Sequence, residues 1–202
     1  MSYQEQVIEW YKSLQDNICA GLEKADGLAK FQEDNWSRPE GGGGRSRVIQ
    51  DGNVFEKGGV NFSAVHGVLP DTIKKALGVS KSEFFAAGVS IVLHPKNPWV
   101  PIIHMNTRFF EIEGETWWFG GGIDLTPIYI NDQETKGFHS ELKSTCDQFD
   151  AEYFPKFKEW ADNYFFIKHR NETRGVGGIF YDRLNDRDWS ELFDYNKAIG
   201  DT

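Results

Sequence analysis

Apolar side chains recur at helical spacing at the start of the chain. The recurring positions are Val7, Trp10, Leu14, Ile18 and Leu22. Their three- and four-residue intervals predict an amphipathic helix. Ser2 with Glu5 three residues later predicts a capping box at its beginning, and Gly27 predicts its end.

Two turn signals follow this helix. The run Gly41–Gly44, with Arg45 and Arg47 after it, predicts a mobile loop. It resembles an anion-binding loop, but it lacks the Lys-Ser/Thr pair of a P-loop. Asp51-Gly52 predicts a tight β-hairpin, because both residues accept positive φ angles.

Alternating and β-branched patterns dominate the middle of the chain. They predict strands over Gly88–His94, Ile102–Ile112 and Thr116–Phe119, the last ending before Gly120–Gly122. Because the connections are short, these strands should pair in an antiparallel meander.

The period then changes back to 3.6 residues. Two further helical faces are formed by Phe138, Leu142, Cys146 and Phe149, and by Tyr153, Phe157, Trp160, Tyr164 and Ile167. Glycines from Gly175 onward should end the second helix, Ile179–Leu184 should form a strand, and Asp188 with Glu191 should cap a last helix. We therefore expect one α+β domain over residues 1–202, with a large antiparallel sheet flanked by helices.

Length and composition are consistent with one globular domain in a reducing compartment. The 202 residues are 39% hydrophobic and 15% aromatic, too rich in core-forming side chains for a disordered chain. The two cysteines cannot form a disulfide framework. The longest apolar run, Phe84–Leu93, is short for a membrane span, and no secretory signal is recognisable, so we expect a cytoplasmic protein. A net charge of −9 disfavours nucleic-acid binding.

The strand pattern places several polar groups on one face. With a period of two, Ser90 and His94 share a face of the first central strand, and His104, Asn106 and Arg108 share a face of the second. A solvated outer face is the ordinary interpretation of such alternation. Lys and Glu usually dominate solvated faces, whereas this one combines His, Asn, Arg and Ser with large apolar neighbours. We therefore favour a binding pocket.

Two other segments carry charges in unusual company. Asp124 follows Gly120–Gly122 among apolar residues, either as a turn-forming aspartate or as a carboxylate held for proton transfer or for N–H donors of a ligand. Arg170 and Arg174 end the aromatic helix. One cation there could simply offset the helix dipole, but guanidinium groups also grip carboxylates in bidentate fashion.

The five histidines contain no close metal-binding pair. Each is more often a structural histidine than a ligand. Two strand histidines and two helical ones could still meet in space, which leaves a metal-dependent hydrolase as one alternative.

Several long motifs occur in an order that is similar to the oxygen-dependent coproporphyrinogen III oxidases. They are Gly41–Val48, Phe55–Asn61, Gly88–Pro95, His104–Arg108, Trp117–Pro127 and His169–Phe180. The resemblance implies a large antiparallel sheet between helices, and a homodimer. It also implies an aerobic reaction in which two propionates of coproporphyrinogen III lose CO2 and become vinyl groups, giving protoporphyrinogen IX.

The resemblance also implies roles for individual residues. His104 matches the proposed proton donor and Asp124 an aspartate that faces the pyrrole N–H groups. Substrate-binding positions are matched by Ser90, Asn106, Thr107, Arg108 and Arg174. A divalent metal is sometimes assigned to the positions matched by His94, His104, His139 and His169.

No flavin or haem is implied, because a reduced tetrapyrrole can itself react with dioxygen, which serves as co-substrate. Family members continue well past residue 202, so this sequence should correspond to the N-terminal two-thirds of the family fold. The second hypothesis is accordingly a truncated, non-catalytic tetrapyrrole-binding protein.

Overall fold

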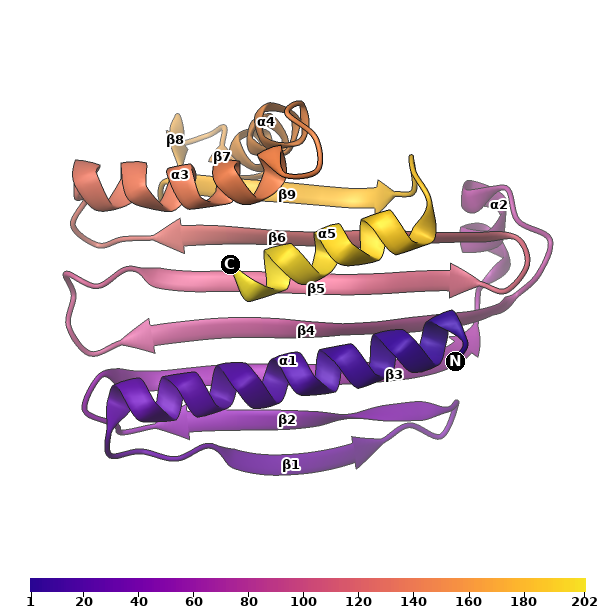
Figure 1. Ribbon diagram of the computed structural model, residues 1–202, viewed down its shortest axis with the longest axis horizontal. Coiled ribbons are helices and arrows are strands. Elements are labelled where there is room, and N and C mark those ends of the chain that lie inside the picture. The colour runs from indigo at the N-terminus through magenta and orange to yellow at the C-terminus, as the bar shows by residue number, and fades with distance from the viewer.

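Seven strands form one antiparallel sheet in the order β1-β2-β3-β4-β5-β6-β9 (Figure 1). The computed structural model describes residues 1–202. The strands are β1 (Gln32–Ser37), β2 (Gly42–Gln50), β3 (Phe55–Val68), β4 (Glu83–Pro95), β5 (Ile102–Ile112), β6 (Thr116–Thr126) and β9 (Gly177–Leu184). Two further strands of two residues each, β7 (Phe166–Ile167) and β8 (Glu172–Thr173), pair in a separate hairpin. The expected α+β class and antiparallel sheet are confirmed.

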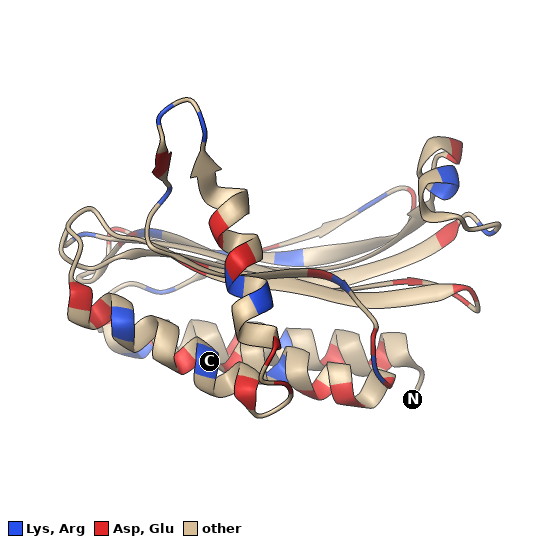
Figure 2. Cartoon of the chain, turned by 90° about the horizontal axis from the view of Figure 1, so that it is seen from above, with Lys and Arg blue, Asp and Glu red and all other residues tan.

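The helices cover mainly one side of the sheet. They are α1 (Tyr3–Asp26), α2 (Asp71–Leu77), α3 (Asp132–Asp147), α4 (Tyr153–Phe165) and α5 (Trp189–Asp201). Figure 2 shows α1, α3 and α5 on one side, whereas α2 and the β7–β8 hairpin rise on the other. We call the first side the helical face and the second the open face. No helix is long and apolar enough to cross a bilayer.

Alternation along the strands separates these two faces. On β4, the side chains of Phe85, Val89 and Ile91 are buried beneath the helices, while Ser90 and His94 are exposed on the open face. Aromatic rings fill much of the core, including Phe109, Phe119, Trp189 and Phe193, whose ring centroids lie 4.7–6.3 Å from their neighbours. The high aromatic content therefore serves the interior as well as the open face.

Several boundaries agree with the sequence. Ser2 and Glu5 form the expected capping box of α1, and Gly27 ends the helix in the left-handed conformation. A hairpin joins β2 to β3 at Asp51-Gly52 as expected, but its loop runs over residues 51–54, and of the two residues only Asp51, with a φ of 57°, has a positive φ. Asp188 occupies the N-cap position of α5 as expected, but its side chain makes no capping hydrogen bond.

Three expected boundaries are wrong, two of them because glycines lie inside strands. Gly42–Gly44 belong to β2 rather than to a mobile loop, and β6 continues through Gly120–Gly122 to Thr126. Pairing with neighbouring strands stabilises both segments despite their poor strand propensity. Helix α4 ends at Phe165, so Arg170 and Arg174 lie in and beside the β7–β8 hairpin rather than on a helix.

A buried hydrogen-bond network ties the helical face together. The Asn196 side chain on α5 is completely buried. Its Oδ1 accepts from Thr107 Oγ1 at 2.7 Å and from the Tyr181 hydroxyl at 3.1 Å, while its Nδ2 donates to the Tyr11 hydroxyl at 2.9 Å. One amide therefore connects α1, α5, β5 and β9.

We expect Asn196→Ala to lower the free energy of unfolding by about 2–4 kcal/mol, because three buried hydroxyl groups lose a partner. Urea denaturation measures the change. Tyr181→Phe, which removes one bond, should cost only about 1 kcal/mol. Equal losses for the two variants would contradict the central role of the amide.

Asp26, the last residue of α1, binds the C-terminal end of this helix to the connection between β2 and β3. Its carboxylate accepts backbone hydrogen bonds from Leu28, Ala29, Asn53, Val54 and Phe55, at 2.8–3.2 Å. Burial disfavours the charged carboxylate, but these N–H groups outweigh that effect and hold the pKa of Asp26 well below its usual range.

Because the pKa is lowered in the folded state, the stabilisation is present above the unfolded value of about 3.9 and is lost as pH falls toward the folded value. Asp26→Asn should therefore lower Tm at pH 7 by about 5–10 °C. The difference in Tm between Asp26→Asn and the wild type should become smaller as the pH is lowered. Thermal unfolding at a series of pH values tests this, and a gap independent of pH would contradict it.

Candidate active site

The polar residues expected to share a face do lie together on the open face. Strand pairing places Ser90 opposite Asn106, Gly88 opposite Arg108, and Val92 opposite His104. Since directly paired residues point to the same side of a sheet, these groups form neighbouring rows. The prediction that Ser90, His104, Asn106 and Arg108 share one surface is confirmed, whereas His94, which was grouped with them, lies at the end of β4 opposite Lys57 and does not line the hollow described below.

Asp124 lies at the centre of the charged groups. It is paired with His104 across β5 and β6, and His104 Nδ1 lies 3.1 Å from Asp124 Oδ2. The same Oδ2 accepts a hydrogen bond from an Arg174 terminal nitrogen at 2.9 Å. The Asp124 side chain is only 8% exposed, and its position within β6 excludes the interpretation as a turn residue.

This geometry leaves one carboxylate oxygen available. Both protein partners of Asp124 bind Oδ2, and Oδ1 has no hydrogen bond within the chain. Oδ1 is also not among the fully buried polar atoms that lack a partner. Asp124 can therefore accept an N–H from a ligand while it orients the ring of His104.

Arg108 forms the second charged centre. One terminal nitrogen donates to Asn106 Oδ1 at 2.6 Å, and the other lies 3.0 Å from Asp182 Oδ1 on β9. Gly120 lies beside this pair, where a Cβ atom would be 2.8 Å from both Arg108 Nε and Asp182 Oδ1. The glycine in β6 thus makes room for the ion pair.

Aromatic rings support the guanidinium groups. Arg174 lies over the Phe165 ring, 4.2 Å from its centroid, and Arg108 lies 5.8 Å from the Phe180 centroid. Such cation–π contacts orient arginines on the open face. Phe180 and Asp182 were not identified from the sequence. Alternation along β9 indicates which of its side chains share a face, but only its pairing with β6 shows that the face is this one.

Thr107 is not part of the open face, which corrects its assignment as a substrate-binding residue. It lies between Asn106 and Arg108 on β5, so its side chain points to the helical face. It is completely buried and donates to Asn196. Thr107 supports the strand from behind and cannot contact a ligand on the open face.

The four histidines do not form a metal site, so the residues of this chain do not fit the metal assignment. No group of three or more His, Cys, Asp or Glu side chains is arranged to hold a metal ion. His104 bonds Asp124, His139 Nε2 lies 3.0 Å from the Val176 carbonyl, and His169 is exposed in the turn between β7 and β8. His94 is exposed opposite Lys57.

A broad hollow extends across the open face. A cavity of about 270 Å³ lies beside His104, Asp124 and Arg174, and a larger one of about 750 Å³ lies beside Arg108. Ser90 and Asn106 line both, so the two are parts of one depression. Its floor includes small residues from adjoining strands, Ser63, Gly88, Ser90 and Gly122, beside large aromatic ones, Trp36, Phe110 and Trp118. Such a floor suits a flat ligand.

Comparison with known proteins gives a consistent result. A family profile described as Coproporphyrinogen III oxidase matches residues 6–202. The chain is 52% identical over 199 residues to an oxygen-dependent coproporphyrinogen-III oxidase, chloroplastic, of Glycine max, covering 91% of this chain and 52% of that protein. It is 58% identical over 171 residues to an oxygen-dependent coproporphyrinogen-III oxidase of Prochlorococcus marinus (strain NATL1A), covering 84% of this chain and 49% of that protein. The chain spans about half the length of the curated relatives it matches, a smaller share than the two-thirds expected from the sequence.

Proposed function

The chain belongs to the coproporphyrinogen III oxidase family, and from this premise we propose that it acts in the oxidative decarboxylation of coproporphyrinogen III to protoporphyrinogen IX. Two propionates of the substrate become vinyl groups. Each loses one CO2, one proton and two electrons, and dioxygen accepts the electrons. The observation that carries the proposal is that Asp124, His104, Arg174 and Arg108 line one hollow on the open face.

The residues have distinct tasks in this proposal. Asp124 Oδ1 accepts pyrrole N–H groups, which holds the macrocycle and stabilises positive charge that develops on it. His104, oriented by Asp124, exchanges protons through Nε2. Arg108 binds a substrate carboxylate, for which its planar guanidinium is suited. Ser90 and Asn106 contribute hydrogen bonds from the floor.

Arg174 has a double task. It is paired with Asp124 and is still 43% exposed, so its remaining N–H groups can bind a second carboxylate. Because guanidinium groups stay charged at physiological pH, the pair also keeps a cation beside the reacting side chains.

Charge distinguishes this hollow from another one in the chain. A cavity of about 380 Å³ beside His66 is lined by Glu40, Glu83, Glu111 and Glu113. Four carboxylates would repel a tetracarboxylate substrate, whereas the open-face hollow presents arginines. The open face is therefore the site that the substrate's charge favours.

Aerobic incubation of the purified protein with reduced coproporphyrin III tests the proposal. Formation of CO2 and of the divinyl product, followed by chromatography, is expected. Absence of product together with retained porphyrin binding would instead support a non-catalytic tetrapyrrole-binding protein. Absence of both product and binding would refute the tetrapyrrole assignment.

The proposal also includes a homodimer and a reducing compartment, with the cytoplasm as the expected location. Both cysteines, Cys19 and Cys146, are free and buried, which agrees with reducing conditions. Burial raises the pKa of the Cys146 thiol to about 11, so it stays protonated and unreactive.

A further inference from the structure

We propose that the arm formed by β1 and β2 binds the end of the macrocycle remote from Asp124, with Trp36 stacking against the tetrapyrrole and Arg38 holding one of its carboxylates. This inference rests on the function proposed above and adds a second half to the binding site. Neither residue was singled out as a binding residue from the sequence.

Strand register places Trp36 on the open face. Trp36 pairs with Gly44, Gly44 with Ser63, Ser63 with Gly88, and Gly88 with Arg108. One row of the sheet therefore begins at Trp36 and reaches Arg108 across three small residues. Four strand spacings of about 4.8 Å separate the two backbones, or roughly 19 Å. Trp36 and Arg108 thus bound a wide, shallow floor.

The Trp36 ring is held in place by its neighbours. A Cβ atom on Gly44 would overlap the indole ring, so only glycine lets the ring lie this close to β2. The indole Nε1 donates to Ser46 Oγ at 3.2 Å. With 36% of the residue exposed, Trp36 still offers surface to a ligand. The glycine run therefore has a structural purpose that its interpretation as a loop missed.

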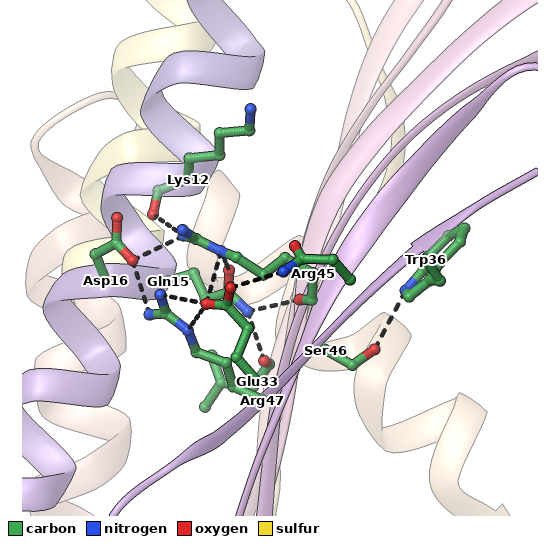
Figure 3. Close-up of polar contacts among 10 residues, drawn as sticks. Lys12, Gln15, Asp16, Glu33, Trp36, Arg45, Ser46 and Arg47 are labelled. Atoms are coloured by element: carbon green, nitrogen blue, oxygen red, sulfur yellow. Dashed lines mark hydrogen bonds and ion pairs between the residues drawn. The ribbon is translucent and has the colours of Figure 1, made fainter.

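A polar cluster on the opposite face of the arm fixes it to α1 (Figure 3). Asp16 lies 2.7 Å from terminal nitrogens of both Arg45 and Arg47, and Arg47 also pairs with Glu33 on β1 at 2.8 Å. Gln15 accepts from Arg45 Nε at 2.6 Å and donates to two backbone carbonyls of the sheet. The cluster links β1, β2 and α1, so Trp36 stands on an anchored strand pair although β1 is an edge strand.

Arg38 follows β1 directly. Its backbone N–H donates to the Gly42 carbonyl at 2.9 Å, which fixes the turn between β1 and β2. Its guanidinium has a single ion pair, to Glu40 at 3.5 Å, and both side chains are exposed. Trp36 and Arg38 line the same 750 Å³ hollow as Arg108. The carboxylate partners of Arg108 and Arg174 lie closer, at 3.0 and 2.9 Å, so Arg38 has the weakest ion pair of the three arginines.

Binding of oxidised coproporphyrin III, measured by fluorescence titration, tests the inference. Trp36→Leu should raise Kd about 5- to 20-fold, because the stacking ring is lost. Trp36→Phe, which keeps a ring, should lose less.

Mesoporphyrin IX, with two carboxylates instead of four, separates the charge of Arg38 from stacking. It has the same flat macrocycle to stack on Trp36, but its two acids can be placed at Arg108 and Arg174, which leaves no carboxylate for Arg38. Arg38→Gln should therefore raise the Kd for coproporphyrin III by a factor that is about 5-fold or more larger than its effect on the Kd for mesoporphyrin IX. The control is Trp99→Leu in the β4–β5 loop, a 63% exposed tryptophan outside the hollow, which should leave both Kd values unchanged.

The outcomes are distinguishable from a failure of the proposed function. If the wild type binds coproporphyrin III and Trp36→Leu binds it equally well, the arm has no role and the inference is overturned. Equal losses for both porphyrins in Arg38→Gln would overturn the assignment of the carboxylate. If the wild type binds neither porphyrin, both the proposed function and this inference are refuted.

Discussion

Asp124→Asn is expected to lower kcat about 10²- to 10⁴-fold with a much smaller change in KM. The substitution keeps the size of the side chain but removes its negative charge. An asparagine can no longer stabilise positive charge on the macrocycle or on the ring of His104, and it weakens the contact with Arg174. Because these interactions matter most as charge develops, the loss should appear in turnover.

Steady-state kinetics with reduced coproporphyrin III measure this effect. Asp147→Asn is a matched control, since Asp147 pairs with Lys143 on the surface of α3, away from the open face. The control should retain full activity. If Asp124→Asn raised KM and left kcat unchanged, the carboxylate would only bind substrate.

Arg108→Gln should raise Kd for coproporphyrin III about 10- to 100-fold, since a charge-assisted hydrogen bond contributes about 1.5–3 kcal/mol. Removing the guanidinium also leaves Asp182 without its cation, and the unpaired Asp182 carboxylate repels the carboxylates of the ligand. Arg108→Lys keeps the charge but loses the planar fork, so its Kd should lie between the wild type and Arg108→Gln.

Fluorescence titration at two salt concentrations measures the Arg108 effect. Lys143→Gln removes a cation from the surface of α3 and should leave Kd unchanged. If Arg108→Gln and Lys143→Gln had equal Kd values, the carboxylate site would have to lie elsewhere.

Local patterns predicted the central strands and the face that carries the site. Alternation in Gly88–His94 and Ile102–Ile112 was enough to group Ser90, His104, Asn106 and Arg108, because the side-chain period of a strand is fixed at two. Asp124 and Arg174 were singled out from their own segments, and the resemblance assigned both to one site; the ion pair between them confirms that they lie together.

The remaining parts of the site depend on long-range pairing. Trp36 reaches the hollow only because β1 lies four strands from β5, and Asp182 meets Arg108 only because β9 pairs with β6. No local pattern specifies these neighbours. Thr107 shows the opposite error: its motif suggested substrate contact, whereas strand alternation places it on the buried face.

Glycines were misjudged for a related reason. Gly44 and Gly120 have poor strand propensity, yet each leaves space for a side chain on an adjacent strand, Trp36 in one case and Arg108 in the other. That requirement is visible only once the strands are paired.

The most direct measurement is a structure of the protein with coproporphyrin III bound. We expect the macrocycle on the open face, with its pyrrole nitrogens within hydrogen-bonding distance of Asp124 Oδ1 and a carboxylate at Arg108. A macrocycle bound against the helices, or in the glutamate-lined cavity beside His66, with Asp124 untouched, would contradict the account.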